Sequence, residues 1–143
     1  MLNADGKTFF YDWGELTWRD GNDLITPRNS HVCGYFQWEH TQIFLVAGGI
    51  HSSNGNGLKS VEIMKNGDFW ETGPALPHLM TDIQMVSFER FVILLSNSQD
   101  IYRLNGLHNW LKLDRRLSNP QWVILQKCGS FFRKLKKLKK VNK

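Results

Sequence analysis

The sequence predicts an all-β protein built from repeats of a four-stranded antiparallel sheet. Segment 43–49 consists of five apolar residues followed by two glycines, which is typical of a strand buried on both faces that ends in a sharp turn. Six tryptophans and nine phenylalanines in 143 residues favour sheet structure. A pattern also recurs around Trp18, Trp70 and Trp110. Together these observations indicate a repetitive β fold.

The repeat extends to both sides of the tryptophans. Segments 9–12, 61–64 and 101–104 are similar and stand at the same distance before Trp18, Trp70 and Trp110, respectively. A leucine stands six residues after each of the first two tryptophans, and a phenylalanine stands twelve residues further on; these residues are Leu24, Leu76, Phe36 and Phe88. The chain therefore contains three partial copies of one unit.

Taken in order, the units predict the following strands. Residues 8–18 supply the last two strands of a first unit, near 8–11 and 16–18. Residues 31–77 form a full second unit, with strands near 31–37, 42–48, 59–64 and 68–72. Residues 82–113 form a third, with strands near 82–88, 91–96, 100–104 and 109–113, and residues 120–127 would begin a further unit.

Turn residues separate these strands. Asn66–Gly67 and Asn105–Gly106 suit hairpin turns of type I′ or a related type, in which both central residues have a positive φ. Segment 49–58 is rich in glycine, serine and asparagine, which favour loops. It is the longest loop predicted between the strands, and it joins the second and third strands of its unit.

Charge divides the chain into a body and a tail. Residues 131–143 form a basic tail, which would show an apolar edge and a broad basic face if helical. It holds seven of the eighteen basic residues and no acidic ones, which leaves eleven basic against thirteen acidic residues in the body. Six of these seven are tail-site candidates for acidic partners: Arg133, Lys134, Lys136, Lys137, Lys139 and Lys140.

The cysteine usage and the termini predict an intracellular protein, cytoplasmic or nuclear. Cys33 and Cys128 are far apart and lack metal-ligand spacing, so we expect free thiols in a reducing compartment. The N-terminus lacks the pattern of a signal peptide, and no apolar run is long enough to span a membrane.

The buried strand with its glycine pair, the alternating segment 61–64, the Asn66–Gly67 turn and Trp70 together resemble a kelch repeat. The resemblance covers residues 8–127 and implies blades of a β-propeller, each a four-stranded antiparallel sheet. Kelch propellers mostly bind other proteins, often as substrate adaptors or scaffolds. The fold expected here is therefore an incomplete kelch-type β-propeller over residues 1–130, followed by the basic tail.

The resemblance also implies where a partner would bind. In the family, binding residues come from the loop before the first strand of a blade and from the loop between its second and third strands. The matching positions in this sequence are Arg28, Asn29, His31, His51, Ser52, Asn54, Thr81 and Asp82. Arg28 has two open interpretations: its guanidinium could pair with a partner's carboxylate, or it could make a contact between blades.

The sequence departs from the family pattern in three ways. The third unit has Ser96–Asn97 where a glycine pair is expected, and Met64 replaces the usual tyrosine. Fewer than three complete blades are present, and an open array leaves apolar sheet faces at its ends. We therefore expect a fragment or a degenerate paralogue, or a propeller completed by further blades or by copies of itself.

No constellation of catalytic residues is visible. His31 and Cys33 lie two residues apart, but a Cys–His pair needs an orienting group and an oxyanion site, and a structural role is favoured. Segment 55–60 fails the phosphate-loop pattern. The histidines and carboxylates lack metal-ligand spacing. We expect no enzyme activity, no metal and no cofactor.

Two functions from different classes follow. The first is a protein–protein interaction module of the kelch-repeat type. The second is binding of nucleic acid or an anionic membrane through the basic tail, with the sheet region as a passenger.

Overall fold

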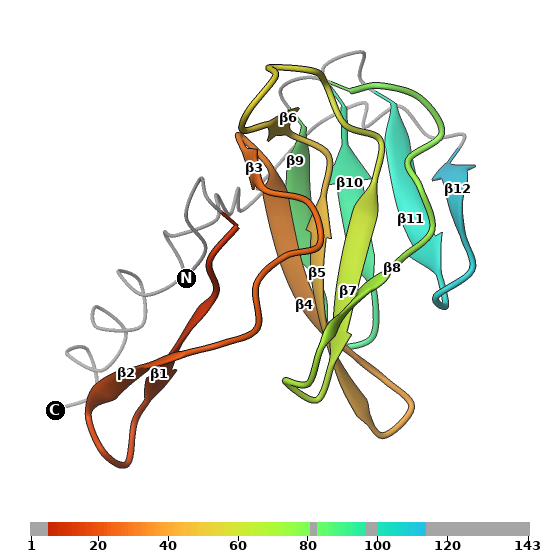
Figure 1. Cartoon of the computed structure of the whole chain (residues 1–143). Coiled ribbons are helices and arrows are strands. Elements are labelled where there is room, and N and C mark those ends of the chain that lie inside the picture. Colours follow the sequence, from red (N-terminus) through yellow and green to blue (C-terminus); the bar gives the residue numbers. More distant parts are fainter. Residues whose placement is uncertain (1–5, 81–82, 97–99, 114–143) are drawn as a thin grey trace, which may run out of the picture.

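The computed structural model is all-β and describes residues 6–80, 83–96 and 100–113 (Figure 1). Two four-stranded antiparallel sheets dominate it. Sheet A contains, in spatial order, β4 (Val32–Trp38), β5 (Thr41–Ala47), β7 (Val61–Lys65) and β8 (Trp70–Thr72). Sheet B contains β9 (Gln84–Ser87), β10 (Val92–Leu95), β11 (Ile101–Asn105) and β12 (Asn109–Leu113). These are the strands that the second and third sequence repeats predict.

Two smaller sheets complete the described part of the chain. An N-terminal hairpin joins β1 (Phe9–Asp12) to β2 (Thr17–Asp20), as the first partial unit predicts. A short ribbon joins β3 (Arg28–Asn29) to β6 (Ile50–His51), which the sequence did not predict. No closed propeller forms from the described strands, in agreement with an incomplete set of blades.

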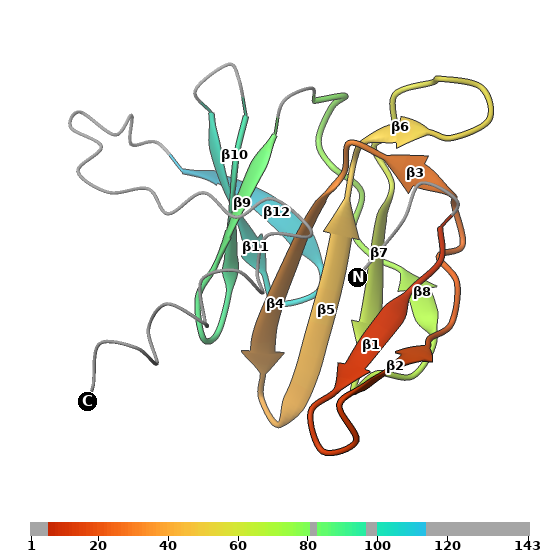
Figure 2. The same ribbon diagram turned by 90° about the vertical axis from the view of Figure 1, so that its left-hand side faces the viewer.

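Sheets A and B pack face to face through the main hydrophobic core (Figure 2). The two sheets approach closely at Gly34 on β4, because a Cβ there would lie 2.6 Å from the Met85 sulfur and 3.0 Å from Val92 Cγ1. The indole of Trp110 donates a hydrogen bond of 2.9 Å to the carbonyl oxygen of Pro74, which follows sheet A. A glycine and a tryptophan thus fix the stacking of the two sheets.

The opposite face of sheet A is covered by the N-terminal hairpin. Phe10 packs edge-on against Phe44, with ring centroids 6.3 Å apart. The indole of Trp70 donates to the carbonyl oxygen of Asn22 at 3.0 Å and lies 3.1 Å from Thr8 Oγ1. Asn22 and Pro74 each stand four residues after the tryptophan of their own unit. The same indole bond therefore joins each unit to the one before it.

The register of the hairpin corrects one expectation. Trp70 pairs with Met64 and Trp110 pairs with Leu104, but Trp18 pairs with Tyr11. The turn between β1 and β2 is therefore one residue longer than its counterparts, and the predicted alignment of 9–12 with 61–64 is wrong by one position. Phe10 takes the place of Ile63, and both side chains point toward the following unit.

The hairpin turns bear out one prediction and contradict another. Asn66 and Gly67 both have a positive φ, 53° and 85°, as a type I′ turn requires. In the other pair only Gly106 has a positive φ, because Asn105 still belongs to β11 and pairs with Asn109. The longer turn of residues 106–108 makes the second positive φ unnecessary.

Two further predictions concern the state of the cysteine thiols and the presence of membrane-spanning segments. Cys33 is disulfide-bonded, so the prediction of a free thiol at this position is wrong. Cys128 lies outside the described residues. Among the residues that the structure describes, no helix is long and apolar enough to cross a membrane.

The glycine pair after β5 has a steric cause. Gly48 and Gly49 have φ values of 62° and 89°, a region that L side chains rarely occupy. A Cβ on Gly49 would also collide with the carbonyl oxygen of Asn29 and lie 3.0 Å from the Cα of His31. Glycine is therefore required for β6 to pass this close to the segment before β4.

The substitution Gly49→Ala should destabilise the fold more than Gly55→Ala does. Gly55 also has a positive φ, 72°, but no atom lies within 4 Å of a Cβ placed there. Both variants incur the backbone penalty of about 1–2 kcal/mol, and only Gly49→Ala adds a collision with backbone. Urea unfolding of the two variants measures the difference, and equal losses would contradict the steric argument.

Candidate binding surface

The ribbon of β3 and β6 brings the two predicted binding loops together at one end of sheet A (Figure 1). Arg28 pairs with His51 and Asn29 pairs with Ile50 in this ribbon. The backbone N–H of Ser52 donates to the carbonyl oxygen of Pro27 at 3.0 Å. We call residues 27–31 and 50–57 the loop ridge. Segments more than twenty positions apart in the chain form one continuous edge there.

Internal hydrogen bonds hold the longer loop of the ridge in one shape. His51 donates its N–H to the carbonyl of Asn56 at 2.8 Å, and Gly55 donates to the carbonyl of His51 at 3.0 Å. The side-chain oxygen of Asn54 accepts from the N–H of Asn56 at 3.0 Å. The imidazole Nδ1 of His51 lies 3.2 Å from the N–H of Ser53. A loop closed in this way loses little entropy when it binds a partner.

The ridge presents a neutral polar surface. Residues 49–58 include no lysine, arginine, aspartate or glutamate. Residues 52–57 are exposed, and Ile50 is 39% exposed beside them. Leu79, 59% exposed, adds an apolar neighbour, because a Cβ on Gly57 would lie 3.3 Å from its Cδ2. Such a surface suits recognition by hydrogen bonds and apolar contacts rather than by ion pairs.

Arg28, a predicted partner contact, is buried inside this chain. Its side chain is fully buried and forms an ion pair with the equally buried Glu62 of β7. One terminal nitrogen donates to the carbonyl oxygens of Gly48 and Ser60 at 3.0 and 2.9 Å. The other also donates to Ser60 Oγ, and Nε donates to the carbonyl of Thr26. Gly48, Ser60 and Glu62 lie in the second unit and Thr26 lies just before it, so neither a partner's carboxylate nor a contact between the two large sheets describes the role of Arg28.

Glu62 completes the arrangement from the other side. Its carboxylate accepts the backbone N–H groups of Ile25 and Thr26 at 2.7 and 3.0 Å. The ion pair therefore joins segment 25–28, the end of β5 and strand β7, and it carries the loop ridge. The sequence contained a signal for this role, because Arg28 is the only charged residue in segment 24–38.

The imidazole of His31, the last residue of ridge segment 27–31, is enclosed within the chain. Both ring nitrogens are buried, and neither has a hydrogen-bond partner among the described residues. Burial, and to a smaller extent the positive charge of Arg28, lower the pKa of His31 from 6.5 to about 4. His31 is therefore a neutral side chain that packs against Gly49, and its nitrogens do not face a partner.

The remaining predicted site residues divide into two groups. Asn29, His51, Ser52 and Asn54 lie together on the ridge. Thr81, Asp82 and the whole basic tail lie outside the described residues. Within the described ranges, no group of three histidine, cysteine or acidic side chains is arranged to hold a metal ion.

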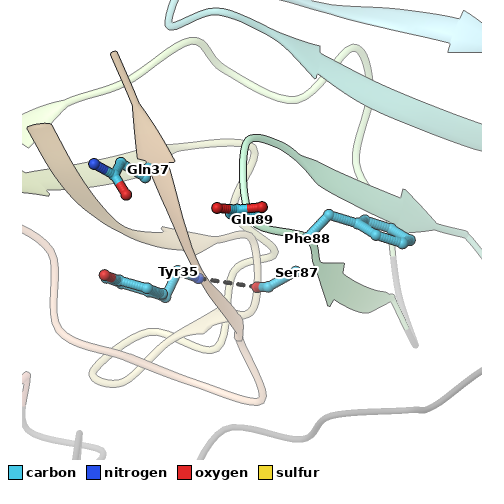
Figure 3. Close-up of a pocket in the computed structure, with 5 residues that line it drawn as sticks. All are labelled: Tyr35, Gln37, Ser87, Phe88 and Glu89. Atoms are coloured by element: carbon cyan, nitrogen blue, oxygen red, sulfur yellow. Dashed lines mark hydrogen bonds between the residues drawn. The ribbon is translucent and has the colours of Figure 1, made fainter. Parts of the chain in front are cut away.

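A pocket that the sequence did not indicate lies between the first strands of the two sheets (Figure 3). It is lined by Tyr35, Gln37, Ser87, Phe88 and Glu89 and has a volume of about 300 Å³. The N–H of Tyr35 donates to Ser87 Oγ at 2.9 Å, and this bond bridges β4 and β9. These residues come from two units, so only the stacking of the sheets brings them together.

Removal of either partner of the buried ion pair should destabilise the protein strongly. Arg28→Met leaves the Glu62 carboxylate buried without its counter-charge. Glu62→Tyr leaves the Arg28 guanidinium buried without its counter-charge. We expect a loss of about 3–5 kcal/mol in the free energy of unfolding for each single variant.

The double variant Arg28→Met/Glu62→Tyr supplies the control. It reproduces the third unit, where Met80 and Tyr102 occupy the same repeat positions and are buried in the main core. We expect it to be more stable than either single variant, because no buried charge remains uncompensated. Chemical unfolding of all three variants measures this, and a double variant as unstable as the sum of the singles would contradict it.

His31 should make the fold sensitive to mild acid. Its folded-state pKa of about 4 lies below the unfolded value of 6.5. The unfolded chain therefore binds a proton first as the pH falls, and His31 removes up to roughly 3 kcal/mol of stability between pH 6.5 and 4. His31→Leu should lose less stability over this window, as measured by unfolding at each pH. The exposed control His40→Leu should keep the pH dependence of the parent protein. If His31→Leu also keeps it, His31 is not the cause of the loss of stability in acid.

No protein-family model matches this chain, and no curated protein matches it.

Proposed function

We propose that this protein is a protein–protein interaction module of the kelch-repeat type and that it binds its partner through the loop ridge. The observation that carries the proposal is the pairing of β3 with β6. The ribbon joins residues 28–29 to residues 50–51 on one edge. These residues belong to the two loops that the kelch resemblance implies for partner binding, which supports the proposal.

The chemistry of the ridge supports binding rather than catalysis. Both ring nitrogens of His31 are buried, and the guanidinium of Arg28 is bound inside the chain. The groups that reach the surface are serine and asparagine side chains, with Ile50 and Leu79 beside them. Neutral hydrogen-bonding groups around exposed aliphatic side chains are typical of a site for an extended polypeptide. The partner proposed is therefore another protein that presents an uncharged segment.

Binding through the basic tail is the second candidate, and the concentration of seven basic residues in positions 133–143 favours it. The two candidates differ in their dependence on salt. Neutralisation of anionic groups by lysines weakens steeply as salt rises, because condensed counterions are released on binding. Contacts through an uncharged ridge change little with salt.

A peptide library displayed on phage and selected against the full chain tests the proposal. Selected peptides should bind the parent protein with little dependence on salt, and Ser52→Arg should weaken their binding by roughly tenfold or more, since the change places a long charged side chain on the ridge. His40→Arg is the matched control, because His40 is an exposed turn residue between β4 and β5.

Two results would count against the ridge. Peptides whose binding survives Ser52→Arg place the binding surface elsewhere. Peptides rich in acidic residues, released by moderate salt, point to the basic tail.

A further inference from the structure

The two ends of the stack of sheets carry unlike but complementary side chains. In the described part of the chain, the hairpin packs on one face of sheet A and sheet B packs on the other. The outer face of the hairpin is therefore one end of the stack, and the face of sheet B turned away from sheet A is the other (Figure 2).

The outer face of the hairpin carries an aromatic cluster. The Tyr11 ring lies edge-on to Trp13 and to Trp18, with centroid distances of 4.9 and 5.1 Å. Trp18 is 51% exposed and Trp13 is 63% exposed. Asp20 is exposed on the same face, because it stands two residues after Trp18 in β2.

Internal comparison shows how the repeat uses this position. Trp70 and Trp110 are the equivalents of Trp18 in the next two units, and each is only 8% exposed. In both, the indole bonds to the preceding unit. The position of Trp18 is thus one that the repeat covers with the face of another sheet.

The outer face of sheet B corresponds to the face of sheet A that covers Trp110, and the two faces differ in residue type at one central position. Cross-strand pairing places Ile93, Arg103 and Leu111 in one row across β10, β11 and β12. In sheet A the equivalent row begins with Leu45 and Ile63, which are buried in the core shared with Leu104 and Trp110 of sheet B. Arg103 therefore occupies the place from which Ile63 packs toward the tryptophan of the next unit.

Arg103 is suited to meet an aromatic surface. It is exposed, and its guanidinium lies 4.5 Å from the centroid of the Phe91 ring, so it already stacks on one aromatic face. A guanidinium binds best over tryptophan and pairs well with a nearby carboxylate. The hairpin face supplies both in Trp18 and Asp20.

We infer that two copies of this chain associate head to tail, with the outer face of sheet B of one copy docked on the outer face of the hairpin of the other. Arg103 of the first copy stacks on the Tyr11–Trp18 pair of the second and faces Asp20. The occupant of each end is thus a second copy, and the contact repeats the stacking of sheet B on sheet A. Because the two surfaces differ, the interface is heterologous, and it produces closed rings or open chains.

Sedimentation velocity of the full chain over a concentration series tests the inference. The parent protein should associate reversibly, and Trp18→Ala and Arg103→Glu should each weaken the association by roughly tenfold or more. His40→Ala is the control, because His40 is an exposed residue of the turn between β4 and β5 and lies on neither end face. Circular dichroism establishes that each variant is folded.

Mixing the two disabled variants makes the test specific for a head-to-tail contact. Trp18→Ala keeps an intact sheet B face, and Arg103→Glu keeps an intact hairpin face. An equimolar mixture should therefore form a discrete pair, one copy of each, while each variant alone stays monomeric.

Three results would overturn the inference. The first is a parent protein that remains monomeric at the highest concentration, whether the two end faces are then covered by other residues of the same copy or by solvent. The second is association that neither variant weakens. The third is a mixture in which association is not restored, since a symmetric interface would give that result. Peptide binding to the ridge is measured separately and does not depend on any of them.

Discussion

The buried ion pair between Arg28 and Glu62 is the interaction on which the loop ridge depends. The segment before β4 and the exit from β5 leave backbone groups pointing into the interior, and such groups must find partners. The guanidinium donates hydrogen bonds to the carbonyl oxygens of Gly48 and Ser60, and the carboxylate accepts hydrogen bonds from the N–H groups of Ile25 and Thr26. Each charge is compensated by the other, so neither is isolated in the core.

The third unit solves the same problem without charge. Met80 and Tyr102 stand where Arg28 and Glu62 stand in the second unit, and Ser96 replaces the first glycine of the pair. The third unit also connects its second and third strands by a much shorter segment. Of these two units, the one with the charged arrangement is the one whose long loop must be held on the sheet, which indicates that the pair serves the ridge rather than the stacking of the sheets.

Much of the fold could be predicted because repeat period and strand alternation are local signals. The strands of sheets A and B and the Asn66–Gly67 turn follow from them. The one-residue offset of the hairpin could not be predicted, since segment 9–12 is apolar on both faces and fits either register. The β3–β6 ribbon is only two residues long on each side, too short for an alternating pattern. The burial of Arg28 depends on acceptors from three separate segments, and no single stretch of sequence shows that.

Two arginines illustrate why residue type alone leaves the site undetermined. Arg28 has five nearby oxygen acceptors within the chain, one of which belongs to the counter-charge Glu62, so its hydrogen-bond donors are all supplied with partners. Arg103 lies on the face of sheet B, where its neighbours in the row are aliphatic and Phe91 covers one side of its plane. A guanidinium has five donors, and a single aromatic ring satisfies none of them. Covering Arg103 removes its guanidinium from water, which costs free energy. The cost is smallest when the covering surface also brings a carboxylate, as the hairpin face does with Asp20 beside Trp18. The same requirement explains why isoleucine stands at this position in sheet A, where the covering sheet brings no acid.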